Sequence, residues 1–205
     1  MTIEVKNSIK PVDYDKSIKI LEKRVEDVRL GKKNEYLWIV EHRSVYTAGT
    51  SSKKTDLLNK NLKVIKTKRG GKYTYHGPGQ KVVYFVLNLN KRDKDIRKLI
   101  NKIEDCIINI LKEYNITSFK DKKNVGVWVH NGNKEEKIAA IGIKIRKWIA
   151  YHGFSLNISN DLKKYNAIIP CGIKNKGVTS LKLMGINNYK NINNIIIKNF
   201  LNTFA

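Results

Sequence analysis

The chain has 205 residues with 41% hydrophobic content, which is enough to bury one core in a single domain spanning residues 1–205. No apolar run reaches the roughly 18 residues of a membrane-spanning helix, and residues 1–5 do not begin a signal peptide, so we expect a cytoplasmic protein without a membrane partner. Basic residues outnumber acidic residues by 41 to 18, but the net charge of +23 is scattered along the chain, which favours acidic protein partners over a nucleic-acid partner.

The N-terminal third predicts a short strand, a helix and a longer strand. Either Asp13 or Asp15 can cap a helix that ends at Gly31 and presents an apolar face at helical spacing, formed by Ile18, Leu21, Val25 and Val28. Residues 3–5 and residues 36–41 have the apolar, β-branched composition of strands. His42 follows the second strand, where it is either a hydrogen-bonded structural residue or a functional one.

The middle of the chain predicts three strands and a long loop. Residues 45–48 and residues 62–67 have strand-like patterns. Residues 69–80 contain four glycines and one proline, so they predict a loop whose backbone forms a wall, because such a composition cannot form a packed helix. Residues 82–89 are apolar on both faces, which is typical of a central strand.

Two helices are predicted in the C-terminal half. Residues 93–114 carry a wide apolar stripe at helical spacing, and Cys106 lies beside that stripe, where it should fill the core. The tail from about Asn191 repeats the helical spacing with isoleucine and phenylalanine.

A β-hairpin is predicted between these helices. Residues 125–129 and residues 138–145 have strand composition, and Asn131-Gly132 between them is a hairpin-turn signal. Residues 148–158 add a further strand. The order of elements predicts an α/β fold in which helices flank a mixed β-sheet, and no phosphate-loop or dinucleotide glycine pattern follows a strand.

Cys171 lies between Pro170 and Gly172, and this turn can hold a thiol in a defined place because proline fixes φ and glycine permits close approach. A small buried cysteine is the alternative, and two cysteines do not make a disulfide framework. A free thiol has a pKa near ~8.5, so a nucleophilic role needs a neighbouring cation. Lys137 starts an apolar strand and is a candidate for that cation, although it can equally be a solvated charge like Lys134.

Five motifs occur in order along the chain, in residues 37–49, 69–80, 137–142, 152–162 and 170–180. The second contains Arg69-Gly-Gly-Lys-Tyr-Thr-Tyr-His76, and the last contains Pro170-Cys-Gly172 and Val178-Thr-Ser180. Together they resemble the octanoyltransferase (lipoate–protein ligase B-type) family of lipoate biosynthesis. The resemblance covers most of the chain, and the order of five motifs makes it far more specific than one Pro-Cys-Gly turn.

The resemblance implies the catalytic fold of lipoate and biotin protein ligases, and an acyltransferase that needs no cofactor and no metal. Its donor would be octanoyl-acyl carrier protein. Its acceptors would be lysines of the lipoyl domains of 2-oxoacid dehydrogenase E2 subunits and of the glycine cleavage H protein. The octanoyl group would pass through a thioester on the enzyme, in a step that is nearly isoenergetic.

The resemblance also assigns site residues. It implies that Cys171 is the nucleophile and that Lys137 completes a Cys–Lys dyad. The family's substrate-contacting segments map onto Arg69, Gly70, Gly71, Lys72, Tyr73, Thr74, Tyr75, His76, Ala140, Ile141, Gly142, Gly153, Phe154 and Ser155. His152 would have a supporting role, and His76 would orient a backbone group, shuttle a proton or be structural. Asp161 would fix a turn.

Two positions depart from the family pattern. Phe154-Ser155 stands where many relatives have Leu-Ala, which would alter the shape of the acyl slot, and Ala48 stands where leucine is frequent.

Two other functions remain open from the sequence. An ATP-dependent lipoate or biotin ligase of similar fold activates a free acid as an acyl-adenylate and needs no cysteine, so the Pro170-Cys171 turn and ATP dependence distinguish it. A basic nucleic-acid-binding protein would fit the net charge of +23, but aromatic and basic residues do not alternate and no zinc-finger spacing occurs.

Overall fold

The structure is a computed structural model, and it describes residues 2–169 and 176–205. Across the main sheet the strands follow the order β1 (Ile3–Asn7), β2 (Glu35–Val40), β6 (Gln80–Asn88), β10 (Ile149–Asn157), β9 (Lys134–Arg146), β8 (Val127–Asn131) and β7 (Ser118–Lys120), and β11 (Gly177–Val178) pairs with β9. The β1–β2 and β9–β11 pairs are parallel and the others antiparallel, which confirms the predicted mixed sheet.

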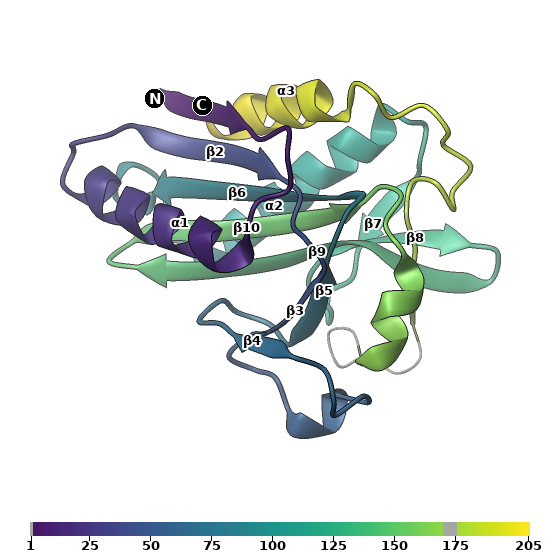
Figure 1. The fold of residues 1–205 in the computed structure, drawn as a ribbon. Helices are drawn as coiled ribbons and strands as arrows, with labels where there is room; N and C mark the ends of the chain where they lie inside the picture. The colour runs from purple at the N-terminus through teal and green to yellow at the C-terminus, as the bar shows by residue number, and fades with distance from the viewer. Residues whose placement is uncertain (1, 170–175) are drawn as a thin grey trace.

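Helices cover both faces of this sheet (Figure 1). α2 (Ile96–Lys112) and α3 (Ile192–Phe204) lie on one face over the largest hydrophobic cluster, whereas α1 (Tyr14–Arg29) packs against β6 and β10 on the other face. The side chains of β2 alternate between the two clusters, Leu37 and Ile39 on the α2–α3 side and Tyr36, Trp38 and Val40 on the α1 side. The predicted α/β architecture is therefore confirmed.

A second, three-stranded sheet lies below the main sheet in Figure 1 and joins β4 (Val64–Lys66), β3 (Val45–Ala48) and β5 (Tyr73–His76) in that order. The loop prediction for residues 69–80 is wrong over β5, which pairs antiparallel with β3. These four residues are aromatic or β-branched, which favours a strand. The loop prediction followed from the glycine content of residues 69–80 as a whole and overlooked this short segment.

The helix predictions are confirmed with small changes at their ends. Asp13, rather than Asp15, caps α1, and its side chain accepts a hydrogen bond from the Lys16 backbone N–H. α2 begins three residues later than predicted because Asp95 caps it through the Lys98 backbone N–H. In both cases a carboxylate satisfies a free N–H group of the first helical turn.

The predicted hairpin is present, but the turn lies one residue further along. Asn131 pairs with Lys134, so Gly132 and Asn133 form the two-residue turn, and Gly132 has a positive φ of 58°. The strand predicted over residues 62–67 is confined to β4. β7, β11 and the 3₁₀ helices η1 (Lys54–Asp56), η2 (Leu89–Lys91) and η3 (Leu162–Ala167) were not predicted, because each is too short to show a periodic pattern.

Candidate active site

Lys137 lies at a bulge in β9. Trp128 of β8 pairs with Lys137 while Val127 pairs with Ala139, so Ile138 is an extra residue in the ladder. The extra residue reverses the alternation of side chains, and Lys137 and Ala140 consequently line the same hollow. The bulge is what aims a lysine of this strand at the site.

The ammonium group of Lys137 is buried, with the residue only 5% exposed. Its Nζ donates a hydrogen bond to the Val125 carbonyl oxygen at 2.9 Å and lies 4.6 Å from the centre of the Trp128 ring. A carbonyl dipole and an aromatic face both stabilise a cation that is removed from water. Lys134 is exposed at the start of β9, so the two lysines differ, and Lys137 is not a solvated charge.

Glu104 of α2 holds the backbone beside Lys137. This carboxylate is 4% exposed and accepts the Gly126 backbone N–H at 3.1 Å, while its burial raises its pKa. Gly126 has a φ of 126°, and a Cβ there would lie 2.7 Å from the Ala139 carbonyl oxygen and 3.2 Å from Lys137 Cε. Only glycine fits between β9 and the lysine stem.

A cavity brings together most of the residues expected to contact an acyl chain. It opens where β5 and the preceding loop face β6, β9 and β10, and it is lined by Arg69, Gly71, Lys72, Tyr73, Thr74, His76, Ala140, Ile141, Gly142, Gly153, Phe154 and Ser155. Thr74, Ala140 and Ser155 also line the hollow around Lys137. These three residues therefore separate the cavity, which we call the slot, from the lysine.

Two of the expected residues lie outside the slot lining. The Tyr75 hydroxyl is hydrogen-bonded to Ser44 Oγ at 2.7 Å, and the ring packs in the small-sheet cluster. Gly70 donates its backbone N–H to the Ile143 carbonyl oxygen at 3.0 Å and so joins the slot wall to β9.

The departures from the family pattern fall on different faces of the sheet. Ser155 pairs with Ala140, and both line the slot and the Lys137 hollow. Phe154 pairs with Ile141 and is part of the main hydrophobic cluster. Ala48 is buried in the small-sheet cluster. Ser155 is thus the departure that lies between the slot and Lys137.

Arg69 forms one wall of the slot with its guanidinium buried. One terminal nitrogen donates to Thr47 Oγ1 at 2.7 Å and to the Lys72 carbonyl oxygen at 3.0 Å, and the other donates to the Gly70 carbonyl oxygen at 2.9 Å. The side chain lies flat against β9 because position 142 is glycine, where a Cβ would be 3.3 Å from Arg69 Cδ. The planar fork of an arginine suits these several acceptors.

Three buried histidines lie at the end of the slot nearest α1, and burial lowers the pKa of each. Burial lowers the pKa of His76 to about 3, helped by its neighbour His42, and burial together with Arg69 lowers the pKa of His152 to about 3. Burial also lowers the pKa of His42. Its ring is hydrogen-bonded to the Val12 carbonyl oxygen and to the Tyr84 hydroxyl, which confirms a structural histidine. A proton-carrying role for His76 is disfavoured at neutral pH.

His152 has an unusual backbone conformation, with a φ of 68° that side chains rarely adopt. Its ring stacks on Tyr151 and lines the slot, and its Nδ1 has no hydrogen-bond partner among the described residues. His152 therefore contributes a strained, buried polar group to the slot.

A buried amide pair links the slot to the segments on either side of residues 170–175. His76 Nδ1 is hydrogen-bonded to Gln80 Oε1 at 2.6 Å, and Gln80 Nε2 donates to Asn157 Oδ1 and to the Tyr165 hydroxyl, each at 2.9 Å. Asn157 in turn donates to the Thr179 carbonyl oxygen at 2.9 Å. Asn157 lies in one of the five motifs, but the sequence did not indicate that it links the slot to these segments.

Cys171 lies outside the described residues, but both flanks of its segment are placed. Before it, the Ile169 backbone N–H donates to the Asp56 carbonyl oxygen at 2.7 Å. After it, Val178 of β11 pairs with Lys137 itself. Asp161 fixes a turn as predicted, because its side chain caps η3 through the Lys163 backbone N–H.

Residues 13–200 match the family described as the lipoyl protein ligase A/B catalytic domain. The chain belongs to this family. Several relatives of the chain are octanoyltransferases. The octanoyltransferase of Wolbachia sp. subsp. Brugia malayi is 46% identical, and the match covers 94% of this chain and 95% of the relative's chain. That of Anaplasma phagocytophilum is 45% identical over the full length of both chains, with 100% coverage of each.

Solved structures show the same fold for this family member. A bi-partite lipoate protein ligase from Thermoplasma acidophilum superposes with a TM-score of 0.73 at 15% identity, covering 100% of this chain and 86% of that one. Lipoate-protein ligase A bound with ATP gives a TM-score of 0.72 at 15% identity, covering 98% and 87%. The family and its octanoyltransferase members make the chain an acyltransferase of lipoate biosynthesis.

The structure adds slot residues that the sequence did not indicate, namely Tyr14, Val82 and Tyr84. Tyr14 is the first residue of α1 and Tyr84 is on β6, and neither lies in one of the five sequence motifs. Among residues 2–169 and 176–205 there is no cluster of three or more histidine, cysteine or acidic side chains that could hold a metal. Within the same ranges, every helix is too short or too polar to span a membrane.

Proposed function

We propose that the chain moves an octanoyl group from octanoyl-acyl carrier protein to a lysine of a lipoyl domain, through a thioester on Cys171 and with Lys137 as its partner. Residues 1–205 would act as one catalytic domain in the reducing cytoplasm, which keeps the thiol free. One observation carries the proposal: the slot lies against the hollow of a buried lysine, and β11, just after the Cys171 segment, pairs with that same lysine.

In the first half-reaction the thiolate of Cys171 attacks the carbonyl carbon of the donor thioester. Backbone N–H groups stabilise the tetrahedral oxyanion, and the carrier's carbon–sulfur bond then breaks. The carrier sulfur takes a proton from the Lys137 ammonium and leaves as a thiol, so Lys137 becomes neutral. The ammonium of Lys137 favours the Cys171 thiolate before attack, because a nearby cation stabilises the anionic sulfur. The eight-carbon chain lies in the slot beside Ala140 and Ser155.

In the second half-reaction the neutral amine of the acceptor lysine attacks the acyl-enzyme. The bond to Cys171 breaks, an amide forms, and the sulfur leaves as a thiolate. Lys137 in its neutral form accepts the proton that the amine loses. The donor thioester already holds the acyl group activated, so no ATP is consumed.

Intact-mass analysis tests the thioester directly. Incubation with octanoyl-acyl carrier protein should add one octanoyl group, which hydroxylamine removes. Cys171→Ser should abolish this adduct, whereas Cys106→Ser should keep it, because Cys106 is 0% exposed and burial raises its pKa to about 12. A hydroxylamine-sensitive adduct on Cys171→Ser that is missing from Cys106→Ser would contradict the assignment.

Lipoate protein ligases share this fold, so an ATP-dependent ligase is the alternative. The same mass experiment, run without ATP or added metal, separates the two functions. Transfer that requires ATP and free acid would move the chain to the ligase class.

A further inference from the structure

A strongly basic part of the surface is built by the small sheet and its loops. Residues 53–72 contain seven lysines and one arginine against a single acidic residue. Six of these lysines are exposed, and η3 adds two more exposed lysines beside them. We call this set the basic surface: Lys53, Lys54, Lys60, Lys63, Lys66, Lys68, Lys163 and Lys164.

The acidic residue in residues 53–72 does not reach the outside. Asp56 is 8% exposed, and its carboxylate faces Lys72 Nζ at 3.7 Å. The lysines from Lys53 to Lys68 take part in no ion pair among the described residues. The charges of these lysines are therefore unpaired and directed to solvent, and Asp161 at the start of η3 is the exposed acidic residue beside Lys163 and Lys164.

The segments of the basic surface are joined to one another. The Leu58 and Asn59 backbone N–H groups donate to the Ala167 carbonyl oxygen at 3.0 and 3.1 Å, and the Tyr46 hydroxyl donates to the Lys164 carbonyl oxygen at 2.9 Å. Leu58 is 58% exposed, so an apolar side chain lies among the lysines. An apolar contact surrounded by like charges is typical of a surface that binds a protein of opposite charge.

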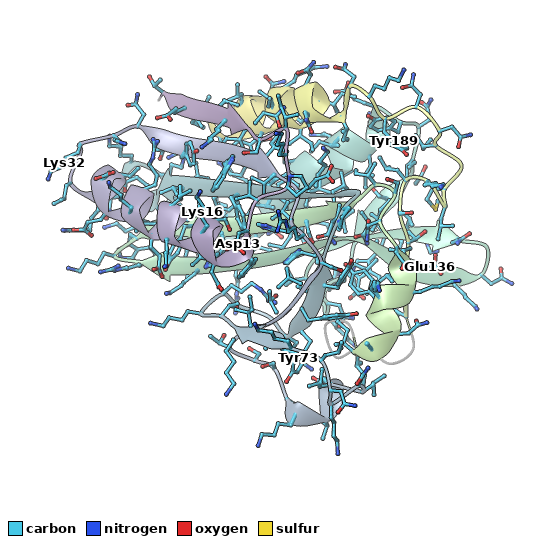
Figure 2. The ribbon with its side chains drawn as sticks, viewed as in Figure 1. Asp13, Lys16, Lys32, Tyr73, Glu136 and Tyr189 are labelled. Atoms are coloured by element: carbon cyan, nitrogen blue, oxygen red, sulfur yellow. The ribbon has the colours of Figure 1, made fainter. Side chains whose placement is uncertain are left out.

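The basic surface adjoins the site on two sides. Lys66 and Lys68 lead directly into the slot wall that begins at Arg69, and Figure 2 shows Tyr73 of that wall within the lobe formed by the small sheet, below the main sheet. Leu57 forms a bridge with Ile168, three residues before Cys171. A protein bound here would lie beside the slot.

The lysines of α1 provide a contrast within the same chain. Lys16, Lys19 and Lys23 are exposed, but Asp15 and Glu22 are exposed among them. Figure 2 shows Lys16 and Lys32 on the α1 side, away from the lobe that holds Tyr73. The charge of this face is mixed, so it attracts an acidic partner less strongly.

We propose that the basic surface docks the acidic face of the acyl-carrier donor, so that the carrier's thioester arm enters the slot. The inference rests on the proposed function, since it assigns the donor's position at that site. The donor is favoured over the acceptor because the surface continues into the slot wall, which the donor's acyl chain must enter first. Charged residues at the rim of a contact mainly raise the association rate and its salt dependence.

Charge reversal tests the docking surface. The variant Lys60→Glu, Lys63→Glu, Lys66→Glu, Lys68→Glu is compared with Lys16→Glu, Lys19→Glu, Lys23→Glu, Lys32→Glu, which changes the net charge equally. Initial rates are measured with octanoyl-acyl carrier protein and with octanoyl-pantetheine, which has no protein surface. The first variant should raise KM for the carrier donor about tenfold or more and weaken its salt dependence.

With octanoyl-pantetheine, both variants should keep kcat/KM within about twofold of the wild type, which also shows that they fold. Equal effects of the two variants on the carrier donor would overturn the proposal. A higher KM for the lipoyl domain with an unchanged KM for the carrier would overturn it too, and would assign the surface to the acceptor. A wild-type chain that uses neither donor would instead refute the proposed function.

Discussion

Mild acid should destabilise this protein more steeply than its carboxylates explain, because histidines buried beside the slot cannot take up a proton in the folded state. His76 is 7% exposed and His152 is 3% exposed, and both have a pKa lowered from 6.5 to about 3. The unfolded chain binds protons at these residues below about pH 6.5, while the folded chain does so only near the lower value.

The sign and size of the effect follow from proton linkage. Stability rises with pH wherever the unfolded state binds more protons, so the contribution is complete above about pH 6.5 and is lost between there and about pH 3. At about pH 5 each histidine has lowered the free energy of unfolding by about 2 kcal/mol, so His76 and His152 together lower it by about 4 kcal/mol. That is a large share of the roughly 5–15 kcal/mol of a typical domain.

Urea unfolding at a series of pH values measures this loss. Carboxylates titrate mostly below the interval from about pH 7 to pH 5, so the histidines dominate the slope there. His76→Gln and His152→Asn should each make the loss about 2 kcal/mol smaller, whatever the substitution does to stability at neutral pH. Asparagine suits position 152 because it tolerates the positive φ of 68°.

His130 provides the matched control, since it is exposed on β8. His130→Asn removes an exposed imidazole in place of a buried one, so it shows whether the loss depends on burial. Identical slopes in the wild type, His76→Gln and His152→Asn would refute the reasoning, because the buried histidines would then be protonated equally in both states.

Two further substitutions test how Lys137 is held and what it does. Lys137→Ala should slow alkylation of Cys171 by iodoacetamide near neutral pH, whereas Lys137→Arg should keep part of that reactivity but fail in transfer, because guanidinium does not release its proton. Rates matching those of the control Lys134→Ala would leave Lys137 without a catalytic role. Gly126→Ala should lower the unfolding free energy in urea by about 1–3 kcal/mol and reduce the transfer rate, because its Cβ would press on Lys137. Gly132 also has a positive φ, but no atom lies within 4 Å of the place where its Cβ would be, so Gly132→Ala is the control. A transfer rate reduced equally by Gly126→Ala and Gly132→Ala would refute this reasoning.

Local patterns in the sequence were sufficient for most of the fold. The apolar spacing of α1, α2 and α3 and the double-sided apolar run of β6 depend on neighbouring residues, so they could be read without tertiary information. The motif order also indicated the family, and it marked thirteen residues that the structure brings around one slot. β5 was missed because its strand composition occupies only four residues between glycines.

Tertiary structure alone decided how the site is built. Nothing local to β9 predicts the bulge at Ile138, which depends on the register with β8 and turns Lys137 into its hollow. The neutral histidines and the contact between Glu104 and Gly126 arise only when segments distant in sequence are buried together. A charge or a hydrogen bond acquires its strength from such burial, which removes water from both partners, and no sequence pattern records which partners will meet.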